Sequence, residues 1–347
     1  KIDACACLFE IAKSEIGYTM QRPAEYTCCV LAAALKENYQ APVFVQGDHF
    51  QVNAKNYAAD PAKEIAGLKE LATEGVEAGF YNIDVDSSTI VDLSKETVIE
   101  QQRNNFEVCA EITKHIRSIE PENITVSIGG EIGEVGKKNS TPEELIAFME
   151  GFNGVLSLGD EPVGISKISV QTGTEHGGAV LPDGTIAKVK LDLDTLEKLG
   201  EVSRNQFNIG GAVQHGASTL PSSAFNNFAK RQAVEVHLAT AFQNIIYDSK
   251  HFPEDLKQQI YNWLAENCQS DRKTDWTDDQ YFYKTRKKGF GPFKKELWSL
   301  PSSTKSALMS ELAETFDMMF DGLGIKGSRE AVNKFVKPAP VHKNCPV

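Results

Sequence analysis

The sequence predicts an α/β protein in which strands and helices alternate, as in a (β/α)₈ TIM barrel. Short β-branched runs alternate with helix-length amphipathic runs from residue 5 to about residue 247, which predicts parallel strands joined by helical crossovers. Seven such units also suit a doubly wound sheet, and this alternative stays open. A closed barrel has eight units, and the chain starts at Lys1 instead of a methionine, so we expect the first β/α unit to be truncated.

Strands and helices are assigned in order along the chain. The predicted strands cover residues 5–11, 42–47, 81–86, 124–129, 165–172, 208–213 and 233–238. Helices are predicted at residues 24–38, at 61–79, after Ser94 as N-cap, after Thr141 with Pro142 and Glu144 forming a capping box, at 193–202, and from Pro221. Residues 250–347 are charged and aromatic without a strand pattern. We therefore expect a barrel over residues 1–249 and a helical C-terminal extension over 250–347.

Composition excludes several classes of protein. The 347 residues carry a formal charge of −12, which disfavours nucleic acid as a partner. The longest apolar run, residues 28–35, is far shorter than the ~20 residues that a membrane-spanning helix needs. Seven cysteines, an odd number without a C-x-x-C motif, do not indicate a disulfide framework, so we expect a reducing cytoplasm.

Histidines lie at the ends of several predicted strands. His49, His176 and His215 follow the second, fifth and sixth strands, each close to a glycine, and His237 ends the seventh. The carboxyl ends of barrel strands meet at one mouth, so these side chains are expected to converge there. Three imidazoles with an open fourth position are typical of a catalytic zinc site. A single histidine at a strand end is more often an ordinary loop residue, and this alternative also stays open.

Glycine-rich turns and acidic residues occur at the same strand ends. The turn His215–Thr219 and the later Ala239–Thr240 each precede a helix, where backbone N–H groups can bind phosphate; plain helix N-caps are the alternative. Residues 131–139 resemble a mobile glycine loop that carries a carboxylate, although a solvated turn has the same composition. We interpret the basic run 284–288 (KTRKK) as a solvated helix face, and a contact with an anion is the alternative.

Six segments occur in the order and at about the spacing found in one enzyme family. They are PVFVQGDHF (42–50), NIDVDSS (82–88), GEIGEVG (130–136), QTGTEHGG (171–178), QHGASTLP (214–221) and VHLATAFQ (236–243). With these segments the chain resembles the class II, metal-dependent fructose-bisphosphate aldolases and their tagatose-bisphosphate relatives. The resemblance covers about two thirds of the chain.

The resemblance implies a role for each matching residue. His49, His176 and His215 would bind one catalytic Zn²⁺, with Asp86 and Glu131 supporting the metal or receiving it when it shifts. Asp48 would exchange a proton with the C4 hydroxyl, and Glu134 could protonate the carbanion. The phosphate would be held by Gly177, Gly216, Ser218, Thr219, Ala239 and Thr240, and His237 would contact the substrate or approach the metal. A Na⁺ or K⁺ ion near the phosphate and a homodimer or homotetramer are common in the family.

The chain also departs from the family pattern. Gln46 stands where the family usually has His, and Gly129 where it has Glu; the glycine loop has Lys137 and Lys138 where acids are usual. Further departures are Thr219, His237 and Ala241. These differences put the second proton transfer in doubt and indicate that the substrate has drifted from fructose 1,6-bisphosphate.

The expected reaction is reversible aldol cleavage of a ketose 1,6-bisphosphate to two triose phosphates. A divalent metal would stabilise the enediolate as a Lewis acid, so no Schiff-base lysine is required. The alternatives are a zinc-dependent sugar or sugar-acid epimerase or aldolase, and a non-catalytic partner subunit of an aldolase. A barrel metal hydrolase is disfavoured because the H-x-H strand signature is missing.

Overall fold

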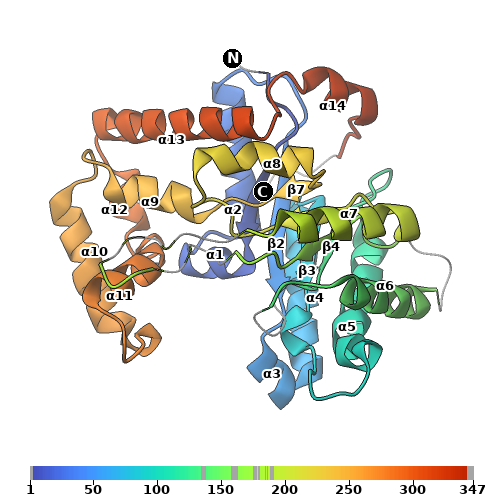
Figure 1. Ribbon diagram of the computed structural model, residues 1–347. Coiled ribbons are helices and arrows are strands. Elements are labelled where there is room, and N and C mark those ends of the chain that lie inside the picture. Colours follow the sequence, from blue (N-terminus) through green and yellow to red (C-terminus); the bar gives the residue numbers. More distant parts are fainter. Residues whose placement is uncertain are drawn as a thin grey trace.

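Seven parallel strands form one sheet in which each strand pairs with the next in sequence (Figure 1). The computed structural model describes residues 3–133, 138–157, 163–174, 178, 180–183, 185, 187 and 191–341. The strands are β1 (Leu8–Ala12), β2 (Phe44–Gln51), β3 (Asn82–Asp86), β4 (Ser127–Glu131), β5 (Lys167–Val170), β6 (Ala212–Gln214) and β7 (Glu235–Val236). A doubly wound sheet reverses its strand order at a switch point, and this sheet does not, so that alternative is wrong.

The sheet curls until its two ends face each other. His237, just after β7, places Nδ1 3.0 Å from Oε2 of Glu10 on β1. Gln46 Nε2 on β2 lies 3.5 Å from Glu235 Oε2 on β7. The α/β prediction is therefore confirmed, with a sheet like that of a TIM barrel. Within the described residues no eighth strand joins β1 to β7, so closure and a truncated first unit stay predictions.

Helices follow the strands as the alternation predicts. After β1 to β7 come α1 (Lys13–Tyr18), α2 (Pro23–Lys36), α3 (Ala54–Ala59), α4 (Pro61–Ala78), η1 (Ser88–Ile90), α5 (Val98–Ile119), α6 (Pro142–Leu156), α7 (Leu193–Phe207), η2 (Ser222–Ala224), α8 (Phe225–Lys230) and α9 (Thr240–Asp248). The later helices are α10 (Glu254–Asn267), η3 (Gln269–Asp271), α11 (Asp278–Thr285), η4 (Arg286–Gly289), α12 (Lys294–Trp298), α13 (Ser302–Gly322) and α14 (Arg329–Phe335). In Figure 1, α10 and α11 lie on the opposite side of the sheet from α3 to α7.

Capping chemistry explains where two of the helices begin. The predicted capping box of α6 is confirmed: Thr141 Oγ1 accepts from the backbone N–H of Glu144, and the Glu144 carboxylate accepts from that of Thr141. The predicted N-cap of α5, Ser94, is wrong. Thr97 caps this helix instead, because Glu100 completes a reciprocal box with it, while Ser94 donates to Asp92.

The buried apolar residues form two clusters. The larger lies between the strands and α4 to α7 and includes Phe50, Ile83, Phe148 and Phe152, all with no exposed surface. The second lies among the later helices, around Tyr247. Among the described helices, none combines the length and the hydropathy that crossing a membrane would require.

Candidate metal centre and active site

A β-bulge in β2 places two candidate site residues side by side. Between Gly47 and Phe50 the pairing of β2 with β3 shifts, and His49 has a left-handed φ of 41°. In a regular strand, consecutive side chains point to opposite faces. The bulge instead lets the side chains of Asp48 and His49 both line the cavity at the end of the sheet. The prediction that His49 follows the second strand is therefore wrong, because the strand continues to Gln51.

Two buried carboxylates orient the His49 ring. Its Nδ1 lies 3.1 Å from Asp86 Oδ2 and 3.2 Å from Glu131 Oε2. Asp86, the last residue of β3, is itself held by Ser88, whose Oγ donates to Oδ1 over 2.7 Å. An imidazole whose Nδ1–H is donated to a carboxylate presents the lone pair of Nε2, as metal-binding histidines do.

His215 reaches the same place from the loop after β6. Its ring centroid lies 4.4 Å from that of His49, and its Nε2 is 2.9 Å from Ser169 Oγ, which leaves Nδ1 as the ligand atom. Ligand-capable atoms of Asp48, His49 and His215 all lie within 4.8 Å of one another. Two imidazoles and nearby carboxylates match the donor set of a catalytic Zn²⁺ site, so these residues fit the metal that the sequence predicts.

Charges at the centre strongly perturb these groups. Burial would raise the pKa of Asp48, but His49 and His237 hold it well below its ordinary value. Burial would lower the pKa of His49, but Asp48 and Glu131 raise it well above the ordinary range. The centre therefore favours an ionised Asp48 and attracts a cation, either a proton or a metal ion.

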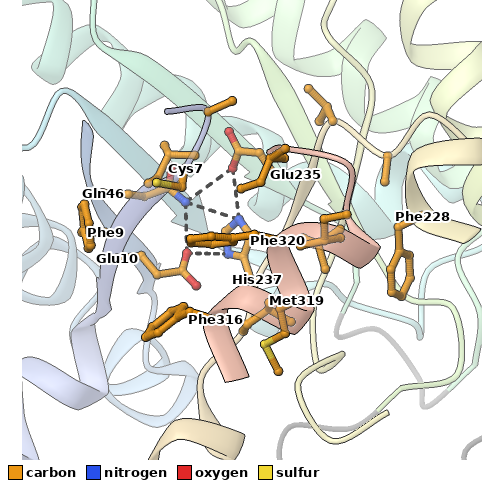
Figure 2. A pocket seen from close by; sticks show the side chains of 18 of the residues that line it. Cys7, Phe9, Glu10, Gln46, Phe228, Glu235, His237, Phe316, Met319 and Phe320 are labelled. Atoms are coloured by element: carbon orange, nitrogen blue, oxygen red, sulfur yellow. Dashed lines mark hydrogen bonds and ion pairs between the residues drawn. The ribbon is translucent and has the colours of Figure 1, made fainter. Parts of the chain in front are cut away.

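A buried polar cluster lies beside Asp48, and sequence reasoning missed most of it. Figure 2 shows His237 between Glu10 and Glu235, with Gln46 adjacent, at the polar end of a cavity of about 330 Å³. Aromatic side chains of α13, among them Phe316 and Phe320, line the rest of this cavity. Only His237 of this cluster was a candidate, and the structure places it against Asp48.

Lys167 supplies the positive charge of the cluster. Its side chain is 2% exposed and its Nζ lies 3.1 Å from Asp84 Oδ1, donates to Gln46 Oε1 over 2.7 Å, and pairs with Glu235. Burial would lower the pKa of Lys167, but the two carboxylates raise it above the ordinary value. An uncompensated charge at this depth would be costly, so the cation and the acids require each other.

A period of two links this cluster to the predicted site. Side chains two apart on a strand share a face, so the residue two before a site residue points into the same interior, one layer deeper. This relation holds for the pairs Gln46 and Asp48, Asp84 and Asp86, Gly129 and Glu131, Lys167 and Ser169, and Glu235 and His237. For Gln46, Asp84 and Glu235 the available signal was a step of two residues back from the predicted residues Asp48, Asp86 and His237.

The two predicted phosphate turns meet in space. Ser218 Oγ accepts a hydrogen bond from the backbone N–H of Ala241 over 3.3 Å, so the loop after β6 touches the first turn of α9, next to Ala239 and Thr240. Gly216 has a left-handed φ of 67°, which suits glycine. Thr219 Oγ1 is buried and has no hydrogen-bond partner among the residues that the structure describes.

A cavity of about 500 Å³ opens at Asp48 and His49 and extends to Thr240. Its wall includes Lys287 of η4, whose Nζ lies 5.4 Å from the centroid of the Tyr18 ring. The next residue back, Arg286, is buried and donates to Asp248 on α9. The interpretation of 284–288 as a solvated helix face is therefore wrong, because long-range packing, invisible in a local pattern, brings this segment to the mouth.

Three candidate residues lie outside the described part of the chain. They are Glu134, His176 and Gly177. The loop that carries His176 and Gly177 is held at its β5 end: Thr174 Oγ1 donates to the carbonyl of His215 over 2.8 Å, and Thr172 Oγ1 donates to Gln214. The loops after β5 and β6 are therefore joined at the mouth.

Solved structures share this fold. A probable tagatose 6 phosphate kinase from Sinorhizobium meliloti 1021 is similar with a TM-score of 0.57 and 16% identity, over 96% of this chain and 90% of that one. A fructuronate-tagaturonate epimerase, UxaE, from Cohnella laeviribosi gives a TM-score of 0.65 and 13% identity, over 93% and 76%. At these identities the likeness concerns the fold alone. No curated protein sequence matches significantly.

A family model provides the assignment. The model of "Fructose-bisphosphate aldolase class-II" matches residues 6–286, which include every described site residue named above except Lys287. The match also spans all seven strands and the loops that bring Asp48, His49 and His215 together. The chain therefore belongs to the class II fructose-bisphosphate aldolase family.

Proposed function

We propose that the protein is a metal-dependent aldolase that reversibly cleaves a ketose 1,6-bisphosphate, with fructose 1,6-bisphosphate as the first substrate to test. The products would be glycerone phosphate and glyceraldehyde 3-phosphate. The observation that carries the proposal is the position of Asp48, an acid with a depressed pKa, among the ligand atoms of His49 and His215. Membership of the aldolase family supports the reaction type.

Asp48 acts as the base in the cleavage direction. It takes the proton of the C4 hydroxyl as the C3–C4 bond breaks, which requires a carboxylate and therefore a low pKa. His49 and His215 would hold Zn²⁺ through Nε2 and Nδ1, with His176 as the third ligand by family resemblance. The metal supplies Lewis-acid stabilisation of the negative charge that develops on the substrate oxygens. Asp86 and Glu131 keep the His49 ring oriented. By the same resemblance, Glu134 returns a proton to carbon.

The phosphate of the ketone half would lie where the loop after β6 meets α9. Backbone N–H groups near Gly216 and at the start of α9, with the hydroxyls of Ser218 and Thr219, offer donors to an anion there. Gly177 would belong to the same subsite by resemblance, as would a Na⁺ or K⁺ ion.

A sugar-acid epimerase is the second candidate. It is favoured by His237, which stands 3.1 Å from Asp48 where the family usually has Asn, and so gives the site a second ionisable group. An epimerase of ketohexuronates would use the same metal and would invert one hydroxyl-bearing carbon without releasing trioses.

Metal analysis and a substrate panel separate these functions. The purified protein is assayed for zinc and for triose phosphate release from fructose and tagatose 1,6-bisphosphates, and for epimerisation of ketohexuronates. Zinc-dependent triose release supports the aldolase, and epimerisation alone supports the second candidate. Zinc binding without turnover, or no zinc at all, would indicate a non-catalytic partner subunit. Borohydride with substrate is expected to trap no lysine adduct, and an adduct would contradict the metal mechanism.

Location and assembly belong to the same proposal. The six cysteines in the described part of the chain are free thiols, which supports a reducing cytoplasm. A homodimer or homotetramer is proposed from the family resemblance, and light scattering on the purified protein would test it.

A further inference from the structure

His237 has both ring nitrogens engaged by other side chains. Nδ1 lies 3.1 Å from Asp48 Oδ1 and 3.0 Å from Glu10 Oε2, and Nε2 lies 3.1 Å from Glu235 Oε2. The side chain is only 7% exposed. When Nδ1 carries a hydrogen, whether the imidazole is neutral or charged, Nδ1 donates that hydrogen to Asp48. The histidine therefore contacts the base that we assign to the reaction.

The far side of the ring is fixed by a buried ion pair. Glu235 pairs with Lys167, and Lys167 Nζ also donates to Gln46 Oε1 over 2.7 Å. These groups come from three different strands; Lys167 and Gln46 are almost fully buried, and the side chain of Glu235 is 15% exposed. Because Glu235 cannot move without breaking the pair, it holds the ring in one orientation. Figure 2 shows His237 between Glu10 and Glu235 in this cluster.

The near side of the ring determines which oxygen of Asp48 faces the cavity. His237 engages Oδ1, and no described residue forms a hydrogen bond with Oδ2. Asp48 lines the 500 Å³ cavity together with His49, so Oδ2 is the oxygen available to a substrate hydroxyl. Without the contact to Nδ1, the carboxylate would be free to turn about its Cβ–Cγ bond.

We propose that His237 is a positioning residue, which the Lys167–Glu235 pair holds in place and which aims Asp48 at the substrate hydroxyl. This inference rests on the proposed aldol chemistry and adds to it a contact that orients the base, which the zinc ligands do not provide. A misplaced base reduces turnover without weakening substrate binding, and a shift of ~1 Å can cost about 100-fold in rate. The loss should therefore appear in kcat, with KM and zinc affinity unchanged.

Two amide substitutions separate the two sides of the ring. In His237→Asn the amide nitrogen replaces Nδ1 and can still donate to Asp48, but contact with Glu235 is lost. In His237→Gln the amide replaces Nε2 and keeps contact with Glu235, but loses Asp48. We expect kcat of the Asn variant within about 5-fold of the parent, and kcat of the Gln variant lower by about 10- to 100-fold.

Crystal structures of the zinc-loaded parent and both variants provide a readout that does not need turnover. The Asp48 carboxylate should keep its orientation in the Asn variant and rotate in the Gln variant. An unrotated Asp48 in the Gln variant, equal losses of kcat in both variants, or a loss confined to KM or zinc affinity would overturn the proposal.

A distant histidine serves as the control. His115 on α5 contacts Thr73, with Nε2 2.8 Å from Oγ1, and lies outside both cavities. His115→Gln should leave kcat and KM unchanged. If the parent cleaves no ketose phosphate, the proposed function fails, while the orientation of Asp48 in the crystal structures still decides the role of His237.

Discussion

The carboxylate of Asp84 occupies the space that a side chain at residue 129 would need. A Cβ built on Gly129 would lie 2.3 Å from Asp84 Oδ1 and 3.1 Å from Lys167 Cε. Gly129→Ala should therefore force Asp84 away from Lys167 and lower the free energy of unfolding by about 1–3 kcal/mol, the usual cost of overpacking. Urea denaturation of both proteins measures the difference.

Gly154 is the matched control for that substitution. It is exposed on α6, and a Cβ there would meet nothing within 4 Å. Gly154→Ala should raise the free energy of unfolding by up to about 1 kcal/mol through helix propensity. If Gly129→Ala were equally harmless, the close packing of Asp84 against residue 129 would be wrong.

Removing the buried cation tests the charge balance of the interior. Lys167→Met removes the lysine counter-ion of Asp84 and Glu235 and leaves only His237, among the described cationic side chains, beside them, so we expect a loss of about 3–5 kcal/mol near pH 7.5. Burial would raise the pKa of Glu235, but Lys167 lowers it to about 2, below its ordinary 4.5. In the parent, this stabilisation is present above pH 4.5 and is lost as the pH falls toward 2.

In the variant the sign reverses. Burial raises the pKa of Asp84 even beside Lys167, and removing Lys167 raises the pKa of Asp84 and of Glu235 above their values in the parent. The folded state of the variant therefore loses stability as the pH rises from about 4 to 8. The gap between parent and variant should therefore be smallest near pH 2 and grow as the pH rises. The control is Lys69→Met, which removes an exposed pair with Glu111 and should cost at most about 1 kcal/mol. A gap independent of pH would contradict the buried ion pair.

Much of the fold was predictable because hydrophobic periodicity reflects local geometry. The alternation of strands and helices and the capping box at Thr141 depend on residues close in sequence, and each was found in the structure. The bulge that places His49 inside β2 was not predicted. It depends on the pairing of two strands, and no local pattern in PVFVQGDHF distinguishes a bulged strand from a strand that ends.

The candidate site was predictable in part for a related reason. His49 and His215 were found because strand ends converge by topology, and polar residues stand out there. Lys167 and Glu235 were missed because a lysine or a glutamate in a strand is ordinarily expected to face solvent. Only the curled sheet turns these two side chains inward. Their opposite charges, one on β5 and one on β7, form an ion pair only in the folded sheet, and the sequence does not show that they meet.

Asp48→Asn tests the assigned base directly. The amide keeps the shape of the side chain but cannot accept the hydroxyl proton, so kcat should fall at least about 100-fold. Zinc content should stay at the level of the parent, because the imidazoles of His49 and His215 remain. Near-normal turnover, or loss of the metal, would contradict the role of Asp48.

Asp86→Asn tests the orientation of the metal ligand. Asp86 Oδ2 lies 3.1 Å from His49 Nδ1, and removing the charge of such a partner weakens zinc binding by about 10- to 100-fold. Competition titration with a chromophoric chelator measures this change. The matched control is Asp92→Asn, an exposed aspartate that accepts from Ser94 and pairs with Lys95 over 3.6 Å, and that should not affect the metal.

The pH dependence of the same titration checks the electrostatic argument. Burial would lower the pKa of His49, but Asp48, Glu131 and Asp86 together raise it, so zinc must displace a proton from this ring near neutral pH. Zinc affinity of the parent should therefore rise with pH through the neutral range. Losing one carboxylate lowers the pKa of His49, so the rise in Asp86→Asn should level off at a lower pH than in the parent. An affinity that does not change with pH in either protein would exclude His49 as a ligand that loses a proton on binding the metal.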